Sequence, residues 1–195
     1  MVFDKLNWFP YIDFDPISKY WKKLQYDISF NHGYNIFNLL FNISYFSKRL
    51  MIRNLEHKDK EVWSKLYNSY ADFYEVPMNA GILDTLWGWI LDEMHIVNGI
   101  CFELEGKIVG IAHYRTMPRP IKGQYVGFLD DLFVLPNYRR QKIAQKLINH
   151  LKFLSKENNW NGIRWITHSS NENAKKLYDK IANNTGFELY ELKRD

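Results

Sequence analysis

The segment that most constrains the fold is DDLFVLPNYRRQKIAQKLI, residues 130–148, because its hydrophobic period changes partway along. It begins as an apolar run typical of a buried strand and ends with apolar residues at helical spacing. A polar turn carrying Arg139, Arg140 and Lys142 joins the two halves. Unpaired N–H groups and the dipole at a helix start favour anions, and nearby cations strengthen that preference. The residues alone leave two readings open: an anion site suited to a diphosphate, or a solvated helix start.

The periodicity of the remaining chain predicts a mixed sheet with helices on its faces. Strands are predicted at 50–56, 100–104, 108–115, 125–134, 162–168 and 186–192, and helices at 59–75, 82–93, 143–154 and 171–184. Residues 117–123 are predicted to be a loop, because prolines interrupt the pattern there. In the first helix, Val62, Leu66, Tyr70 and Phe73 recur at helical spacing and are the expected packing stripe.

A length of 195 residues allows one full domain and a small addition. Residues 1–50 are crowded with aromatics and asparagines and lack a clean period, although 35–46 could form an amphipathic helix. Three interpretations stay open for them: a docked extension, a membrane-surface or partner-binding segment, or sequence upstream of a true start at Met51. The domain proper is expected over 51–195.

Composition argues for a globular protein, with 46% apolar and 25% charged residues. The net charge of +4 is mild, and no RNA-binding motif accompanies the basic stretch 139–152, so a nucleic-acid partner is not expected. The lone Cys101 lies in apolar surroundings and is predicted to be a core residue in a reducing, cytoplasmic compartment. No apolar run approaches the roughly 20 residues of a membrane span. A membrane partner is therefore not expected. No spacing of His, Cys, Asp or Glu residues resembles a zinc site, so a metal ion is not expected either.

Two linked motifs carry a family resemblance. The stretch VLPNYRRQKIAQKLI resembles the acetyl-CoA signature Arg/Gln-x-x-Gly-x-Gly/Ala of the GNAT superfamily of N-acetyltransferases. Downstream, NENAKKLYDKIANNTGF is similar to that family's Asn-x-x-Ala-x-x-Leu-Tyr segment. The resemblance covers roughly residues 51–192. It implies an α/β (α+β) fold with a mixed, mostly antiparallel central sheet of six to seven strands and helices on both faces.

The resemblance also implies how acetyl-CoA is bound. Backbone amides of the turn would hold the pyrophosphate, and the preceding strand would pair with the pantetheine arm. The implied residues are Leu132, Phe133, Val134, Arg139, Arg140, Gln141, Lys142, Ile143, Ala144, Asn171 and Ala174. One departure stands out, because Lys142 occupies the position of the family's first glycine. We expect Lys142 to be tolerated and to add its ammonium group to the anion site.

Acyl transfer to an amine needs a neutral nucleophile and a proton donor for the departing thiolate. Tyr178 matches the family's proton-donating tyrosine, and Asp130 is the expected general base. Because strand neighbours face opposite sides, only one of Asp130 and Asp131 is expected to reach the cleft. The alternative is that both carboxylates cap loops or pair with Arg115 or Arg119. His113 and His168 are interpreted as structural.

The acceptor is predicted to be a small-molecule amine, such as an amino acid or a diamine, acetylated by direct attack. Phe73, Tyr74 and Glu75 could hold a cationic amine, whereas Arg115 could bind a carboxylate. The alternatives are a protein or peptide acetyltransferase, acting on lysine or the N-terminus, and a non-catalytic CoA-binding or regulatory module. Folds of this kind often dimerise through sheet edges, so a homodimer is an expectation that the sequence leaves undecided.

Overall fold

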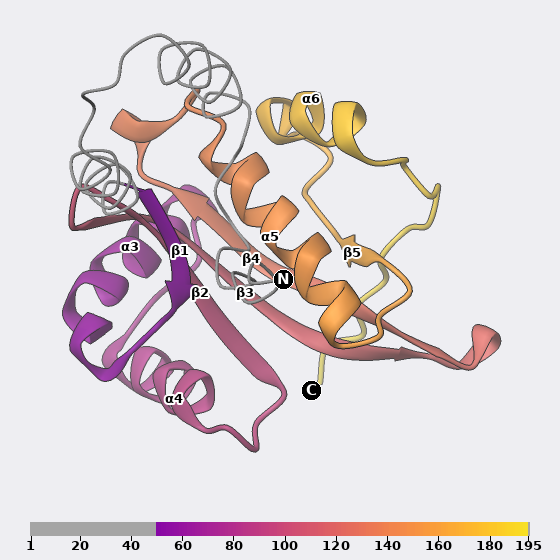
Figure 1. The fold of residues 1–195 in the computed structure, drawn as a ribbon, viewed down its shortest axis with the longest axis horizontal. Coiled ribbons are helices and arrows are strands. Elements are labelled where there is room, and N and C mark those ends of the chain that lie inside the picture. The colour runs from indigo at the N-terminus through magenta and orange to yellow at the C-terminus, as the bar shows by residue number, and fades with distance from the viewer. Residues whose placement is uncertain (1–49, 195) are drawn as a thin grey trace, which may run out of the picture. The chain divides into compact units, whose positions relative to one another are not determined.

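The computed structural model describes residues 50–194, in which five strands form one sheet in the order β1-β2-β3-β4-β5 (Figure 1). The elements in chain order are β1 (Leu50–Asn54), η1 (His57–Asp59), α3 (Lys60–Phe73), α4 (Ala80–Leu91), β2 (Val97–Leu104), β3 (Lys107–Arg119), η2 (Pro120–Lys122), β4 (Gln124–Val134), η3 (Pro136–Tyr138), α5 (Ile143–Glu157), β5 (Ile163–Trp165) and α6 (Glu172–Ile181). The chain divides into two compact units, one ending at Arg164 and the other beginning at Trp165. The predicted features of residues 1–49 lie outside the described residues.

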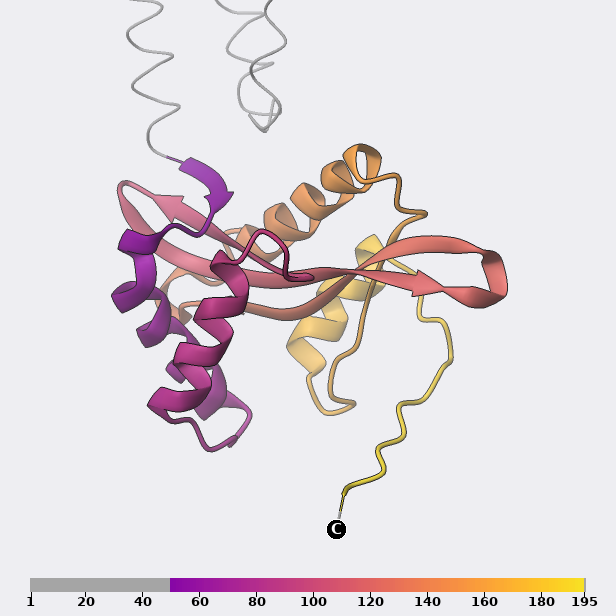
Figure 2. The same cartoon turned by 90° about the horizontal axis from the view of Figure 1, so that it is seen from below.

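The first unit has three layers. Helices α3 and α4 cover one face of the sheet, and α5 covers the other (Figure 2). Strands β1 to β4 pair with their neighbours in antiparallel fashion. The predicted class, a mixed and mostly antiparallel sheet with helices on both faces, is therefore confirmed, with five strands in place of six or seven. Within the described residues no helix is both long and apolar enough to cross a bilayer.

The packing stripe predicted for α3 is wrong in part. Val62 and Phe73 are exposed, whereas Trp63 is fully buried and Leu66 nearly so. The core on this side is built around Trp63 and Trp87, whose ring centroids are 4.8 Å apart. The buried face of α3 is therefore centred on Trp63, one position after Val62, the residue that the helical spacing had suggested.

Two predicted segments differ from the structure. Residues 117–119 belong to β3, because Met117, Pro118 and Arg119 pair with β4 in a long hairpin. Residues 186–192 form no strand, and the apolar side chains of Phe187 and Leu192 are largely exposed. An alternating pattern becomes a strand only where a neighbouring strand pairs with it, and within the described residues no strand pairs with this segment.

A β-bulge in β4 positions the functional site. His113 lies opposite Asp131, but the next residue of β3, Tyr114, lies opposite Leu129. Asp130 is therefore an extra residue on β4. A bulge bends its strand and interrupts the alternation of side chains between the two faces.

Candidate active site

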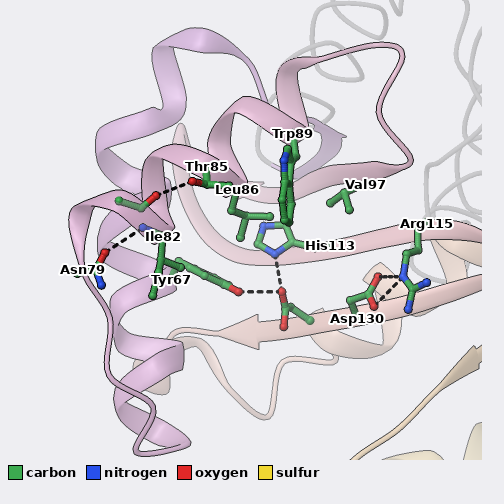
Figure 3. A pocket seen from close by; sticks show the side chains of 12 residues that line it. Tyr67, Asn79, Ile82, Thr85, Leu86, Trp89, Val97, His113, Arg115 and Asp130 are labelled. Carbon is green, nitrogen blue, oxygen red and sulfur yellow. Dashed lines mark hydrogen bonds and ion pairs between the residues drawn. The ribbon is translucent and has the colours of Figure 1, made fainter. Parts of the chain in front are cut away.

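A cavity of about 730 Å³ opens in the first unit between helices α3 and α4 and strands β3 and β4 (Figure 3). This volume is typical of a site for a small molecule. The lining residues are Tyr67, Asn79, Gly81, Ile82, Thr85, Leu86, Trp89, Val97, His113, Arg115, Asp130 and Asp131. Charged side chains come from the strands, and the apolar ones come mainly from α4.

Both adjacent carboxylates line this cavity, so the expectation that only one of them reaches it is wrong. In a regular strand Asp130 and Asp131 would face opposite sides of the sheet. The bulge removes that restriction, because Asp130 is the unpaired extra residue. The result is two carboxylates in one cavity, held by different neighbours.

Asp131 is held by donors from two elements. Its Oδ2 lies 2.8 Å from Nδ1 of His113 and accepts a hydrogen bond from the Tyr67 hydroxyl at 3.2 Å. Burial by itself raises the pKa of Asp131, but the hydrogen bonds from His113, Tyr70 and Tyr67 outweigh burial and leave that pKa below its ordinary value. Asp131 is therefore a stable anion in the floor of the cavity.

A hydrogen bond from Trp63 determines which ring nitrogen of His113 carries the hydrogen. The indole Nε1–H of Trp63 lies 2.9 Å from Nε2 of His113, and both side chains are almost completely buried. An indole N–H can only donate, so Nε2 of His113 accepts and its hydrogen is carried by Nδ1. Nδ1–H then donates to Asp131. The interpretation of His113 as structural is consistent with this geometry, although the residue it supports lines the cavity.

Asp130 is in a different environment. Its two carboxylate oxygens each lie 3.1 Å from Nε of Arg115, and both side chains are about one-third exposed, at 29% and 33%. Burial is the main cause that raises the pKa of Asp130; Arg115 opposes the increase, and the charge of Asp131 adds to it. Neighbouring carboxyl groups with pKa values pushed in opposite directions are a recurring arrangement in acid–base catalysis. The pairing with Arg115 matches one of the alternatives left open by the sequence.

Lys142, in the basic turn before α5, has φ 60° and ψ 15°, a left-handed conformation. Glycine adopts it freely, whereas other residues pay about 1–2 kcal/mol. The backbone at Lys142 thus has the geometry for which a glycine is suited. Within residues 50–194, no hydrogen bond is donated by the backbone N–H groups of Ile143, Ala144 and Gln145.

Arg139 is already engaged at the start of this turn. Its Nε donates to the Val134 carbonyl oxygen at 3.0 Å, and its guanidinium carbon lies 5.7 Å from the ring centroids of both Phe73 and Phe133. Arg139 therefore links the end of β4 to the end of α3. Arg140 also has a positive φ, of 65°.

The last part of β4 has a long strand on one side and a short strand on the other. Leu132, Phe133 and Val134 pair with β3 on one side. β5, the neighbour on the other side, has three residues against eleven in β4. A strand this short leaves most of the outer edge of β4 unpaired within the described residues, and an unpaired edge can accept an extended ligand arm.

Only one of the four residues predicted to bind the acceptor lines the cavity. Arg115 lines the cavity, but Phe73, Tyr74 and Glu75 do not. These three residues lie at and just after the end of α3, where Phe73 approaches Arg139 and Glu75 has a φ of 56°.

Three predicted site residues belong to the second unit. Asn171 precedes α6, and its side-chain oxygen accepts a hydrogen bond from the Ala174 N–H at 3.3 Å. This is an N-cap, which stabilises the helix start. Tyr178 lies on α6 with its ring centroid 5.3 Å from that of Trp165.

Cys101 is a core residue, as predicted, and burial raises the pKa of its thiol to about 12. A thiol of this kind is not a nucleophile at neutral pH. In the part of the chain that the structure describes, no group of three or more His, Cys, Asp or Glu residues could hold a metal ion.

The sequence reasoning missed Tyr67 and Trp63, and it assigned no site role to Asp131 or Trp89. A signal was present in the repeated Asp-Asp within an apolar strand. The bulge that brings both carboxylates to one side, and the histidine that joins one of them to Trp63, depend on tertiary pairing that residue periodicity does not report.

The cavity and the basic turn before α5 both belong to the first unit. The sequence model of the acetyltransferase (GNAT) family matches residues 63–182, more than half of the chain. The protein belongs to this family and is an N-acetyltransferase. Enzymes of this family take the acetyl group from acetyl-CoA.

A curated relative and several solved structures are similar to this chain. The D-amino-acid N-acetyltransferase HPA3 of Saccharomyces cerevisiae is 28% identical over 144 residues, which cover 73% of this chain and 89% of the relative. A ribosomal-protein-alanine N-acetyltransferase from Brucella melitensis biovar Abortus 2308 superposes with a TM-score of 0.64 at 23% identity, covering 74% and 99% of the two chains. The aminoglycoside N-acetyltransferase AAC(6')-Iy in complex with CoA gives 0.64 at 18% identity, covering 75% and 95%. These two structures support the fold.

Proposed function

We propose that this enzyme transfers the acetyl group of acetyl-CoA to the primary amine of a small molecule bound in the cavity, and that an amino acid is the preferred acceptor. The observation that carries the proposal is the bulge in β4, which puts Asp130 and Asp131 into the cavity beside Arg115. Carboxylates attract an ammonium group, and a guanidinium group binds a carboxylate. The name of the yeast relative, a D-amino-acid N-acetyltransferase, supports the same class of acceptor.

The two carboxylates have separate tasks in this proposal. Asp131 attracts the acceptor's ammonium group and remains ionised because His113 and Tyr67 donate to it. An alkyl ammonium with a pKa around 10 must lose a proton before it can attack a carbonyl carbon. Asp130 accepts this proton, because burial raises its pKa and a carboxylate with a raised pKa is a stronger base.

Arg115 completes the acceptor site. Its Nε is occupied by Asp130, and within the described residues its two terminal amino groups make no hydrogen bond. They are available to an acceptor carboxylate. Asp130 therefore also orients the guanidinium group, which lies over the Phe128 ring at 4.9 Å.

The basic turn fits acetyl-CoA, the source of the activated acetyl group in this family. Lys142 supplies the left-handed backbone of such a turn, and the N–H groups of Ile143 and Ala144 are available to phosphate oxygens. Arg140, Gln141 and Lys142 are proposed to line the same site. By the family resemblance, residues 132–134 pair with the pantetheine arm, Asn171 and Ala174 complete the CoA site, and Tyr178 protonates the departing thiolate.

The direct test is release of free CoA from acetyl-CoA in the presence of a panel of amino acids, diamines and peptides. We expect amino acids to give the highest kcat/KM. A preference for peptides would support the peptide acetyltransferase alternative. No release with any member, together with retained acetyl-CoA binding, would support a non-catalytic module.

Tyr178→Phe tests the proton donor separately. We expect turnover to fall by about 10²-fold or more, which is the usual contribution of a general acid, with little change in acetyl-CoA affinity. Tyr190→Phe is a matched control, because Tyr190 is an exposed tyrosine of the same unit. Near-normal turnover in Tyr178→Phe would remove this residue from the mechanism.

A further inference from the structure

We propose that the acceptor carries a large apolar group next to its amine, and that the face of α4 formed by Ile82, Leu86 and Trp89 selects it. This inference rests on the proposed function and adds the side-chain class of the acceptor. We call this face the apolar wall. Its three residues are spaced i, i+4 and i+7, so they share one side of the helix, and all three line the cavity (Figure 3).

The apolar wall is incompletely covered by the protein. Ile82 is 43% exposed and Trp89 is 45% exposed, whereas Trp87, on another side of α4, is buried in the core. Apolar surface in contact with water is stabilised when a ligand covers it. An apolar group entering the cavity gains this contact, and a charged group at the wall would lose hydration without gaining a partner.

Trp89 is held in place before any ligand arrives. Its ring stacks on His95 with centroids 4.9 Å apart and planes inclined by 13°. The imidazole is held in turn, because its Nδ1 accepts the Val97 N–H at 3.1 Å. A wall that is already ordered loses little conformational entropy when a ligand binds.

Strands β3 and β4, on the other side of the cavity from the apolar wall, supply the charged contacts (Figure 3). Asp131 and Arg115 provide a negative and a positive group on neighbouring strands, and the apolar wall provides the third point of contact. These three contacts match the ammonium, carboxylate and side chain of an apolar amino acid. Three different contacts also distinguish the two enantiomers of such an acceptor, because only one places all three groups correctly.

The test compares alanine and phenylalanine, in both enantiomers, as acceptors for the wild-type enzyme and for Trp89→Ala. We expect the wild-type enzyme to prefer phenylalanine in kcat/KM, and the substitution to reduce that preference by about tenfold or more, the usual scale for lost apolar contacts in a pocket. Trp89→Phe should restore most of the preference. Ile96→Ala is the matched control, because Ile96 is an exposed apolar residue that follows α4 in the sequence and does not line the cavity.

The outcomes separate this inference from the proposed function. The enzyme could acetylate amino acids with the same preference for phenylalanine in the wild type and in Trp89→Ala. That result would contradict selection by the apolar wall and leave the proposed function intact. A wild-type preference for alanine, aspartate or lysine would also overturn it. If no amine is acetylated, the proposed function fails, and calorimetry with phenethylamine and ethylamine then tests the wall. If the apolar wall selects the acceptor, the wild type should bind phenethylamine more tightly than ethylamine, and Trp89→Ala should lose this difference. Equal binding of the two amines by the wild type would contradict the inference.

Discussion

The floor of the cavity and the basic turn differ in how their polar groups are satisfied. In the floor, Trp63 donates to His113 and His113 donates to Asp131, so buried polar groups are paired inside the protein. In the turn, the N–H groups of Ile143 and Ala144 have no partner within the described residues, and Lys142 adopts a left-handed conformation. The hydrogen bonds in the floor fix the charge of Asp131, whereas the turn leaves backbone donors available, which the proposed function assigns to the phosphates of acetyl-CoA. Changes in the floor should therefore affect chemistry and stability, and changes in the turn should affect ligand affinity.

The largest expected effect is on turnover, from a change in the cavity. Asp130→Asn should lower kcat/KM by about 10²-fold or more, because a general base contributes on that scale. Acetyl-CoA affinity should be almost unchanged, since Asp130 does not belong to the turn. Asp84→Asn is the matched control, because Asp84 is an exposed carboxylate on α4 that pairs with Lys60 and does not line the cavity. Equal losses in the two variants would contradict the assignment.

The second effect is on protein stability and comes from the hydrogen bond between Trp63 and His113. Trp63→Phe leaves Nε2 of the buried His113 without its donor and should lower the free energy of unfolding by about 1–3 kcal/mol, measured in urea. The control is Trp160→Phe, which removes a hydrogen bond of 3.1 Å to the half-buried Thr116 hydroxyl. Water can replace that bond, so the cost should be smaller. A larger loss in the control would show that the pairing of His113 is not what stabilises the floor.

The smallest expected effects come from Lys142 in the turn. Replacing this residue by glycine should change protein stability and acetyl-CoA affinity in opposite directions. Lys142→Gly removes the left-handed strain and should raise the free energy of unfolding by about 1 kcal/mol. The same change removes an ammonium group and should weaken acetyl-CoA binding severalfold in a titration. Lys142→Met, which removes the charge and keeps the Cβ, should weaken binding without the gain in stability. Tighter binding in Lys142→Gly would show that the side chain obstructs the site.

The sequence predicts the turn better than it predicts the cavity. The change of period across 130–148 and the cations at 139–142 are local properties, and the structure reproduces the strand, the turn and the helix there. The floor depends on Trp63, His113 and Asp131, which are distant in sequence and meet through strand register and the bulge at Asp130. Alternation rules allow only one of two adjacent aspartates in the cavity, and the bulge overrides that rule. The packing stripe of α3 was misplaced for a related reason, because helical spacing alone does not rank Trp63 above Val62.

The pH dependence of kcat/KM in the wild type and in Asp130→Asn tests the central claim most directly. A general base works when it is deprotonated, so activity should rise as pH passes through the pKa of Asp130. Because that pKa is raised, the midpoint of the acidic limb should lie above the ordinary value of about 4. Asp131→Asn should move this limb to lower pH, since the charge of Asp131 contributes to the increase. The account predicts that the limb disappears in Asp130→Asn; a limb with the same midpoint in that variant would contradict it.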